Sequence, residues 1–525
     1  MSMNFNSEQE KDYYELLADM LDDGIIDGSE RDLLNKRKEK YGISDERAKE
    51  IEDFAKREYL ESKTPQFETD GEKDYYDLLV DMLDDGVIDE SERNILNKRK
   101  EKYGISDERA KELEEFAKQN NSASSNDLLE EGKTYYNNGE YDKAIEIFKK
   151  AVELNPDDYL NWHWLGGSYN QNGQYQEAIN SLLKAVELNP DDELNWYWLG
   201  SSYNKNGQYQ EAINSLLKAV ELNPNDYSNW YWLGRSYNQN GQYQEAINSL
   251  LKAVELNPNS EGNYYWLGRS YNDNKQYKEA IESLVKATQL VPDSPEYWYR
   301  LCIAYKNNEQ YQEAINSGLK ATQLNPDYAY NWLELGCSYG RNGQYQEAIN
   351  SLSKAAKLNP DYAGNWSSLG YSYYLNNQYQ EAINSLLKAV ELNPNDAYNW
   401  HWLGTSYNKN GQYQEAINSG LKATQLNPDY ADNWLELGCS YGRNGQYQEA
   451  IEPLLKAIEL NTNDAGLYIL GDVYRINGQY EEAMKYLSKA KELNPDGFYS
   501  WYELGEAYLY NGQFQEAIET LLKAV

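Results

Sequence analysis

The stretch NGQYQEAINSLLKAVELNP occupies Asn172–Pro190, and the same nineteen letters begin again at Asn206 and at Asn240. It contains no residue arrangement typical of catalysis, so its faithful repetition needs a structural explanation. We expect the repeats to build a surface, and we expect the function to lie on the face of that surface where the repeats differ.

The repeat has an almost constant length. Its turn aromatic recurs as Tyr141, Tyr175, Tyr209, Tyr243, Tyr277, Tyr311, Tyr345, Tyr379, Tyr413, Tyr447, Tyr480 and Phe514. Every step is 34 residues except the step to Tyr480, which is 33. Twelve copies of one unit therefore account for residues 126–525.

Each unit is predicted to be a helical hairpin. Apolar residues recur at helical spacing on both sides of Asn172-Gly173, which breaks the pattern. In this unit they are Trp162, Leu165 and Tyr169, then Ala178, Leu182 and Ala185. One hairpin cannot bury its apolar faces alone, so neighbouring hairpins have to stack.

These residues closely resemble the tetratricopeptide repeat. With Tyr159 counted as the first place, that family's pattern has Trp at place 4, Leu and Gly at places 7 and 8, Tyr at 11, Ala at 20 and 27, and Pro at 32. The sequence supplies Trp162, Leu165, Gly166, Tyr169, Ala178, Ala185 and Pro190. The resemblance implies an all-α, right-handed superhelical solenoid. Cys302 replaces the glycine of its unit, and Thr462 replaces the proline.

The N-terminal part holds a second duplication. The sequence from Lys11 to Lys56 returns from Lys73 in nearly identical form, and each copy predicts three helices. These modules resemble the small helical domains of the tellurite-resistance B-like family. The expected organisation is a module at 1–58, a linker at 59–72, a module at 73–118, a polar flexible linker at 119–125 and the repeat solenoid at 126–525.

Charge and composition narrow the class of protein. The net charge is −37, from 49 basic and 86 acidic residues, so we expect neither nucleic acid nor an anionic membrane as a partner. No basic and apolar leader and no long apolar segment is present, which favours a cytoplasmic protein. The three cysteines suit free thiols in a reducing compartment. The heavy use of Asn, Tyr, Lys and Ile suggests a bacterial source.

Catalysis, metals and cofactors find little support. The acidic turn DDGIIDGSE resembles half of a calcium loop, but Leu21 stands at a place that needs an oxygen ligand, and Leu83 does so in the second copy. We interpret the turn as a helix junction with Gly24 in a left-handed conformation. His163 and His401 are the only histidines and neither accompanies a nucleophile, so we expect no enzyme, no metal and no cofactor.

The resemblance also implies which residues face the concave side, namely places 2, 5, 6, 9, 12 and 13 of each first helix. Place 6 carries Trp164, Trp198, Trp232, Trp266 and Trp402; place 5 carries His163, Tyr197, Tyr231, Tyr265, Tyr299 and His401; place 12 carries Asn170, Asn204, Asn238, Asn272 and Asn408. The place 4 tryptophans Trp162, Trp196 and Trp230 are expected to be core, whereas the place 6 indoles are either core or anchors in a groove. The asparagines either bind a peptide backbone or satisfy helix ends.

Inward places also carry charge in both signs. The cations are Lys205, Arg235, Arg269, Arg300, Lys306, Arg341, Lys409 and Arg443, against Asp273, Glu296, Glu334, Asp432 and Glu436. In so acidic a chain, this face would attract an acidic segment inward. Simple placement for solubility is the alternative.

The sequence thus predicts a non-enzymatic scaffold or adaptor that holds an extended, acidic partner segment in repeats two to five. The residues expected to contact it are His163, Trp164, Asn170, Tyr197, Trp198, Asn204, Lys205, Tyr231, Trp232, Arg235, Asn238, Tyr265, Trp266, Arg269 and Asn272. The alternative is a sensor or regulatory subunit of a bacterial multi-protein system, whose superhelix changes shape on binding. The last repeat lacks a polar capping helix, which predicts self-association or a longer chain.

Overall fold

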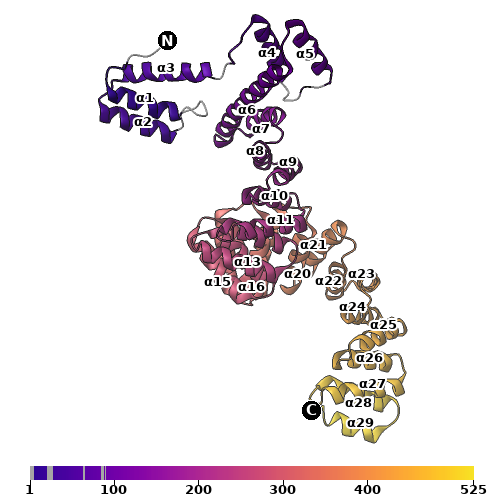
Figure 1. Ribbon diagram of the computed structural model, residues 1–525. Coiled ribbons are helices and arrows are strands. Elements are labelled where there is room, and N and C mark those ends of the chain that lie inside the picture. The colour runs from indigo at the N-terminus through magenta and orange to yellow at the C-terminus, as the bar shows by residue number, and fades with distance from the viewer. Residues whose placement is uncertain (1–4, 21–27, 63–64, 84–87, 89, 525) are drawn as a thin grey trace. The chain divides into compact units, whose positions relative to one another are not determined.

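The computed structural model describes residues 5–20, 28–62, 65–83, 88 and 90–524 (Figure 1). These residues form helices joined by short turns, and no β-strand occurs among them. The acidic turn considered for calcium lies at residues 21–27, and its second copy includes 84–87, so this interpretation falls outside the described residues. The expected all-α class is confirmed.

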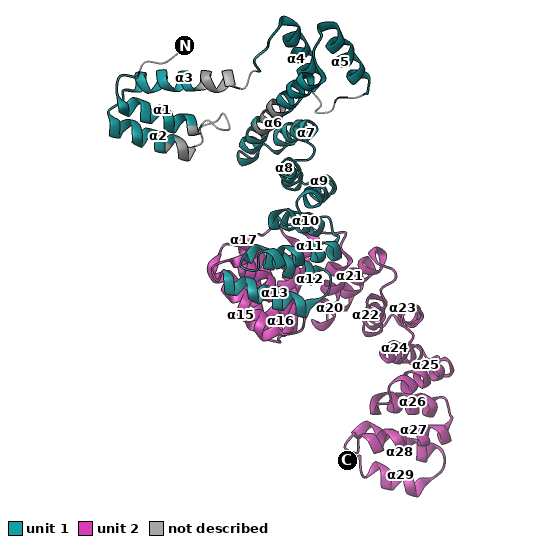
Figure 2. Cartoon of the chain, viewed as in Figure 1, with its two compact units in different colours: residues 1–256 teal, residues 257–525 magenta. Residues whose placement is uncertain are grey.

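The chain divides into two compact units, Met1–Leu256 and Asn257–Val525 (Figure 2). Unit 1 holds the two N-terminal modules and the first four hairpins. Unit 2 holds the remaining eight. The sequence places no boundary there, because the repeat pattern continues unchanged across residue 256.

Each N-terminal module has three helices, as the duplication predicts. They are α1 (Glu8–Met20), α2 (Gly28–Tyr41) and α3 (Asp45–Ser62), then α4 (Asp70–Met82), α5 (Glu90–Tyr103) and α6 (Asp107–Asn137). The two cores bury equivalent leucines, Leu17 and Leu79, completely. In the second module, Arg93 binds both carboxylate oxygens of Glu114, at 2.6 and 2.8 Å, and ties α5 to α6.

Helix α6 contradicts the predicted linker at 119–125. It runs for 31 residues without a break, from the second module into the first repeat. Residues 119–125 contain neither Gly nor Pro, so nothing in the sequence forces the helix to end. Buried anchors lie on both sides, at Ala117 and Leu129. A polar composition was therefore a misleading signal for a flexible linker here.

From α7 onward, helices alternate between the first and second positions of a hairpin. Unit 1 continues with α7 (Tyr141–Leu154), α8 (Tyr159–Gln171), α9 (Tyr175–Leu188), α10 (Glu193–Lys205), α11 (Tyr209–Leu222), α12 (Tyr227–Gln239) and α13 (Tyr243–Leu256). The first hairpin takes its first helix from the end of α6.

Unit 2 repeats the same alternation. It contains α14 (Glu261–Asp273), α15 (Tyr277–Leu290), α16 (Pro295–Asn307), α17 (Tyr311–Leu324), α18 (Ala329–Arg341), α19 (Tyr345–Leu358), α20 (Ala363–Leu375), α21 (Tyr379–Leu392), α22 (Ala397–Lys409), α23 (Tyr413–Leu426), α24 (Ala431–Arg443), α25 (Tyr447–Leu460), α26 (Asp464–Ile476), α27 (Tyr480–Leu493), α28 (Phe498–Tyr510) and α29 (Phe514–Leu521).

Stacking of the hairpins puts the first helices on the inner side of each unit. In unit 1, α10 packs against its own partner α11, against α9 of the preceding hairpin, and against the first helices α8 and α12. In unit 2, α18 likewise contacts α16 and α20. Within the described residues, successive second helices make no comparable contact. We call the side formed by the first helices the inner face.

The two helices of a hairpin approach closely at the glycine of place 8. A Cβ added to Gly370 would lie 2.6 Å from Cγ of Leu386, so only glycine fits. Cys302, which departs from this pattern, faces Gly318 where most other hairpins carry that leucine, and its Sγ lies 3.3 Å from the position of a Cβ on Gly318. The sequence departure is thus compensated within the hairpin.

The turn inside each hairpin needs a left-handed residue. Gly173 has φ +79°, and Lys275, Glu309 and Asn377 adopt φ near +60° at the equivalent place. Glycine adopts this conformation without a steric penalty, which explains its prevalence there.

Candidate functional site

The place 4 tryptophans hold the entry to each hairpin. The indole Nε1 of Trp162 donates to the carbonyl oxygen of Pro156 at 2.8 Å, and Trp196 and Trp230 donate to the equivalent prolines at the same distance. These indoles therefore close the connection between consecutive repeats. This agrees with the structural role expected for place 4.

A row of place 3 asparagines, which the sequence analysis missed, also joins consecutive repeats. Asn161 is fully buried, and its Nδ2 donates to the carbonyl oxygens of Ala151 and Asn155 at the end of α7. Each of these carbonyls also accepts a backbone N–H, Ala151 from Asn155 and Asn155 from Asp158, so the buried amide adds a second donor that ties α8 to the end of α7. The sequence does contain a signal for this role, because asparagine stands at place 3 in every repeat but one from Asn161 to Asn433.

His163 belongs to this packing between repeats. It is 8% exposed, and its Nδ1 lies 2.6 Å from Oδ1 of Asn195 in α10. Burial lowers the pKa of its imidazole, which is therefore neutral at pH 7. The structure therefore buries a side chain that the sequence predicts to contact a partner.

The place 12 asparagines also lie between repeats. Asn170 is 1% exposed and donates from Nδ2 to Oγ of Ser202 at 2.7 Å, and Asn204 donates to Oγ of Ser236 at 2.9 Å. Asn238 is buried as well. These amides bridge to the next first helix because that helix brings a serine hydroxyl within reach. They form neither an exposed peptide ladder nor simple helix-end contacts.

The place 6 indoles of unit 1 are half-buried. Trp164 lies against Tyr136 and Phe148, with ring centroids 5.2 and 6.2 Å away. Trp198 and Trp232 each take an edge contact from the tyrosine that precedes them. Part of each indole remains accessible, so these rings contribute both to packing and to the inner face.

The tyrosines at place 5 in unit 1 are half-buried like the indoles. Burial raises the pKa of Tyr197 to about 12, while a hydrogen bond with the Trp232 indole acts in the opposite direction. Tyr231 contacts the Trp232 ring at 5.7 Å. The aromatic side chains of α10 and α12 thus form one contiguous surface.

Two cations lie beside this aromatic surface. The Arg235 guanidinium stacks on the Trp232 ring at 4.6 Å, and Lys205 Nζ lies 6.0 Å from the same ring. Lys205 Nζ donates to Oδ1 of Asn170 at 2.7 Å, and it makes no ion pair with any residue that the structure describes. Burial, and then the charge of Arg235, lower the pKa of Lys205. We call Trp198, Lys205, Trp232 and Arg235 the unit 1 site.

The remaining predicted residues lie in unit 2 and are more enclosed. Trp266 is only 7% exposed and carries the Arg269 guanidinium 4.7 Å above its ring. Tyr265 donates its hydroxyl to Glu296 at 2.9 Å. Asn272 accepts from Nδ2 of Asn307 at 2.9 Å. Trp266 is thus packed where the sequence predicts an accessible anchor, although the arginine on its ring lies no closer than the equivalent Arg235 on Trp232.

Several inward cations of unit 2 are neutralised by inward carboxylates. Arg300 Nε lies 2.9 Å from Glu296, and Arg269 Nε lies 3.8 Å from Asp273. Lys306 pairs with Glu334. Arg341, in contrast, makes no ion pair with any residue in the described part of the chain. Of the inward cations that the sequence predicts, only a few therefore lack a carboxylate partner within the described residues.

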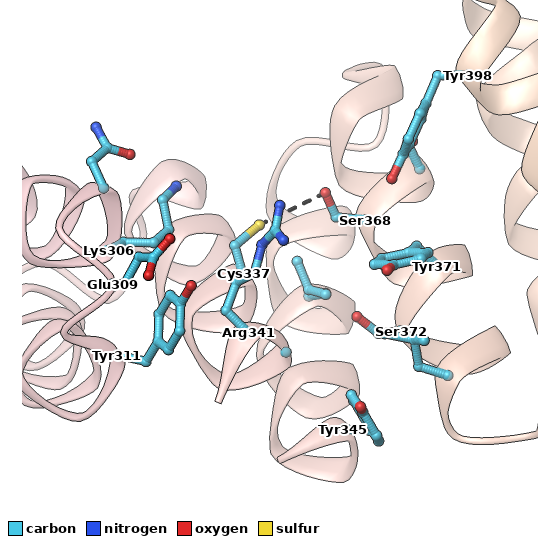
Figure 3. A pocket seen from close by; sticks show the side chains of 15 residues that line it. Lys306, Glu309, Tyr311, Cys337, Arg341, Tyr345, Ser368, Tyr371, Ser372 and Tyr398 are labelled. Atoms are coloured by element: carbon cyan, nitrogen blue, oxygen red, sulfur yellow. Dashed lines mark hydrogen bonds between the residues drawn. The ribbon is translucent and has the colours of Figure 1, made fainter. Parts of the chain in front are cut away.

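A cavity of about 600 Å³ lies on the inner face of unit 2, and the sequence analysis missed it (Figure 3). Most of its lining residues come from the first helices α16, α18, α20 and α22, and Tyr311 of α17 and Tyr345 and Leu352 of α19 also line it. Its principal polar side chains are those of Lys306, Glu309, Arg341, Ser367, Ser368, Tyr371 and Tyr398. Cys337 Sγ lies 3.8 Å from Oγ of Ser368 across it. We call this the unit 2 cavity.

The described residues include neither a metal-binding cluster nor a membrane-spanning helix. They contain no group of three or more His, Cys, Asp or Glu side chains placed to hold a metal ion. None of their helices is long and apolar enough to cross a membrane.

Family models match most of the repeat region. A model described as anaphase-promoting complex, cyclosome, subunit 3 matches residues 113–185, 137–219, 183–253, 218–287 and 443–524. Models described as tetratricopeptide repeat match residues 268–309, 295–328, 333–397, 385–418 and 404–445. The chain belongs to the tetratricopeptide repeat family. A search of curated proteins finds no match.

Solved structures of tetratricopeptide repeat proteins resemble the chain at low identity. The Cut9–Hcn1 hetero-tetramer of the APC/C is 16% identical over 75% of this chain and 91% of its own, with a TM-score of 0.38. Yeast Tom70 is 18% identical over 76% and 91%, with a TM-score of 0.34. YrrB, described as having an unusual peptide-binding site, is 22% identical over 36% and 96%, with a TM-score of 0.32. The family assignment rests on the family models.

The tetratricopeptide repeat pattern explains why the unit 2 cavity exists. Ser367 and Ser368 stand at places 5 and 6, where Tyr197 and Trp198 stand in unit 1. Gly340 stands at place 12, where many repeats carry asparagine. Small side chains at these places leave the space that aromatic and amide groups fill elsewhere. The loss of the common large residues was therefore the signal for this site.

Proposed function

We propose that this tetratricopeptide repeat protein is a non-enzymatic scaffold that holds an extended, acidic partner segment on the inner face of unit 1. Tetratricopeptide repeats bind protein or peptide partners. The proposal adds which surface of this chain binds the partner and which chemical groups of the partner it recognises. The observation that supports it is Lys205, a half-buried cation without a carboxylate partner in the described residues, beside a second cation.

The electrostatics of the unit 1 site favour an anionic ligand. Removing a cation from water costs free energy unless an anion compensates it. Within the described part of the chain, the amide oxygen of Asn170 is the one hydrogen-bond acceptor of Lys205, and Arg235 adds like charge nearby. A carboxylate docked between them would relieve both effects. In a chain of net charge −37, such a place is also a local exception that directs an acidic segment.

The aromatic groups supply apolar contact area beside the cations. Trp198 and Trp232 are half-buried and held by ring contacts, so they lose little conformational freedom on binding. Rigid, partly exposed indoles are common anchors in protein interfaces. A partner segment with acidic and apolar side chains suits this surface best.

The titratable groups do not favour catalysis. Burial raises the pKa of Cys302 to about 12 and that of Cys439 to about 12, so both are neutral thiols at pH 7 and weak nucleophiles. His401, like His163, has its pKa lowered by burial, and its Nδ1 lies 3.1 Å from Asn433. These groups serve the packing of repeats.

Peptide display on the purified full chain tests the proposal. Random twelve-residue peptides selected on the wild type should be enriched in Asp and Glu and should contain aromatic or aliphatic residues. A selected peptide should bind at least tenfold more weakly to the Lys205→Glu, Arg235→Glu double variant and to Trp198→Ala.

Lys218→Glu is the matched control. Lys218 lies on the second helix of the same hairpin as Lys205 and pairs with Glu221 at the exposed surface. This change alters the net charge without touching the inner face, so the affinity should stay within about twofold. Selection of neutral or basic peptides, or equal loss from all charge reversals, would contradict the proposal.

A further inference from the structure

We infer that the unit 2 cavity binds a carboxylate group carried by a partner peptide, with Arg341 as its counterion. The inference adds a second binding site to the proposed scaffold and does not depend on the unit 1 site, because it uses different residues in a different unit. The carboxylate has two sources, an acidic side chain or a C-terminus, and the test distinguishes them.

The cavity has the size and the shape for part of a peptide. Its volume of about 600 Å³ lies within the usual range for ligand sites and accommodates one or two residues. It opens on the inner face, since α16, α18, α20 and α22 are all first helices (Figure 3). A peptide lying along this face could insert one side chain or its terminus.

Three charged side chains line the cavity, Lys306, Glu309 and Arg341, and Glu309 and Arg341 are both exposed. Lys306 is held by Glu334, so its charge is largely compensated. Arg341 has no carboxylate partner among the described residues, and its field lowers the pKa of Tyr398, although burial raises that pKa more. A planar guanidinium can bind a carboxylate through two parallel hydrogen bonds. A single such group suits one carboxylate better than a more highly charged phosphate.

Hydroxyl groups and rings complete the site. Ser368 and Tyr371 of α20 lie across from Arg341 of α18 (Figure 3), Ser367 also lines the cavity, and the three hydroxyls can donate to the ligand's oxygens. The Tyr371 ring packs on Trp402 with centroids 4.5 Å apart, which holds it in place. The wall is therefore polar and preformed.

The unusual small residues that line the unit 2 cavity support a binding function for it. Five other repeats carry tryptophan at the place of Ser368, and several carry asparagine at the place of Gly340. Emptying a packed position costs stability, since contacts are lost and nothing replaces them. In an array of near-copies, loss of both large groups at one point on the inner face is the change that a binding cavity requires.

Three isosteric probes test the inference on the full chain by ligand-observed NMR. N-acetylglutamate amide offers a side-chain carboxylate, N-acetylglutamine offers a terminal carboxylate, and N-acetylglutamine amide is neutral. At least one acid should bind tenfold or more tightly than the neutral compound, and the tighter acid identifies the source. If neither acid binds, or if the neutral compound binds equally well, the inference is wrong.

Variants then locate the binding. Arg341→Gln should reduce acid affinity at least tenfold. Arg443→Gln should leave it within twofold, because Arg443 ends an almost identical helix whose next repeat brings Tyr468 and Ile469 in place of the two serines. Ser368→Trp restores the common residue and should block binding while the chain stays folded.

The two proposals fail separately. Acid binding that survives Arg341→Gln overturns the cavity as the site. Acid binding that is lost in the Lys205→Glu, Arg235→Glu variant and retained in Arg341→Gln places the carboxylate in unit 1, which also overturns the inference yet supports the proposed function.

Discussion

Glu503 is a buried carboxylate in an unusually crowded charge cluster of unit 2. The Arg475 guanidinium lies 2.6 Å from Glu503, 2.6 Å from Asp472 and 3.1 Å from Glu506. Burial, and then the charge of Asp472, raise the pKa of Glu503 to about 7. One guanidinium thus faces three carboxylates and compensates only part of their charge.

This cluster makes stability depend on pH. Because the pKa of Glu503 is higher in the folded chain than its ordinary value of 4.5, its stabilising contribution is complete below pH 4.5 and is lost as pH rises through 7. Glu503→Gln should therefore stabilise unit 2 at pH 8 by about 1–2 kcal/mol and have little effect at pH 4.5. Urea unfolding at both pH values measures this. An equal gain at both would contradict the assignment.

Single residues also show where the sequence is informative. The place 4 indoles were correctly predicted to be structural, because their spacing follows the helical core. His163 and Asn170 were expected on an open surface, yet they hydrogen-bond to Asn195 and Ser202 of the next repeat. Such contacts join residues 32 apart, so periodicity within one helix cannot reveal them.

The helical hairpin is the element that determines the fold. Its two helices approach most closely at the place 8 glycine. Two neighbouring repeats of unit 2 differ in the space that this glycine has. A Cβ at Gly370 would lie 2.6 Å from Leu386, whereas the nearest neighbour of a Cβ at Gly404 would be the carbonyl oxygen of Ala416 at 3.4 Å, because Gly420 stands in place of the leucine.

These two glycines give a matched pair of substitutions. Gly370→Ala should destabilise unit 2 by about 1–3 kcal/mol, because the hairpin must open to admit the methyl group. Gly404→Ala should be neutral or stabilising by up to about 1 kcal/mol, because alanine favours the helix and space is available. Thermal unfolding monitored by circular dichroism compares them. Equal losses would show that the leucine contact does not set the approach.

Hairpin boundaries were largely predictable, because the Asn-Gly turn and the proline recur at fixed places. The continuous helix α6 was not, since residues 119–125 have the composition of a linker, although α6 spans them between buried residues Ala117 and Leu129. The cavity escaped prediction for a related reason. The cavity volume arises because large side chains are missing from two consecutive first helices, α18 and α20, whereas the aromatic row drew attention to places where side chains are large.

For the molecule as a whole, the sign of the salt effect is a strong test. A net charge of −37 repels acidic peptides at most of the surface, and salt would weaken that repulsion. Binding at the Lys205–Arg235 pair reverses the expectation, because salt screens a local attraction. Affinity for a selected acidic peptide should fall severalfold between about 50 and 500 mM salt, measured by fluorescence anisotropy. An affinity that rises with salt would place the peptide elsewhere.

Hydrogen–deuterium exchange with the same peptide tests the central claim most directly, because it reports which helices the partner covers. The account predicts slower exchange in α10 and α12, at residues 193–205 and 227–239, with α9 and α11 unchanged. Protection confined to the second helices, or no protection in unit 1 at saturating peptide, would contradict it.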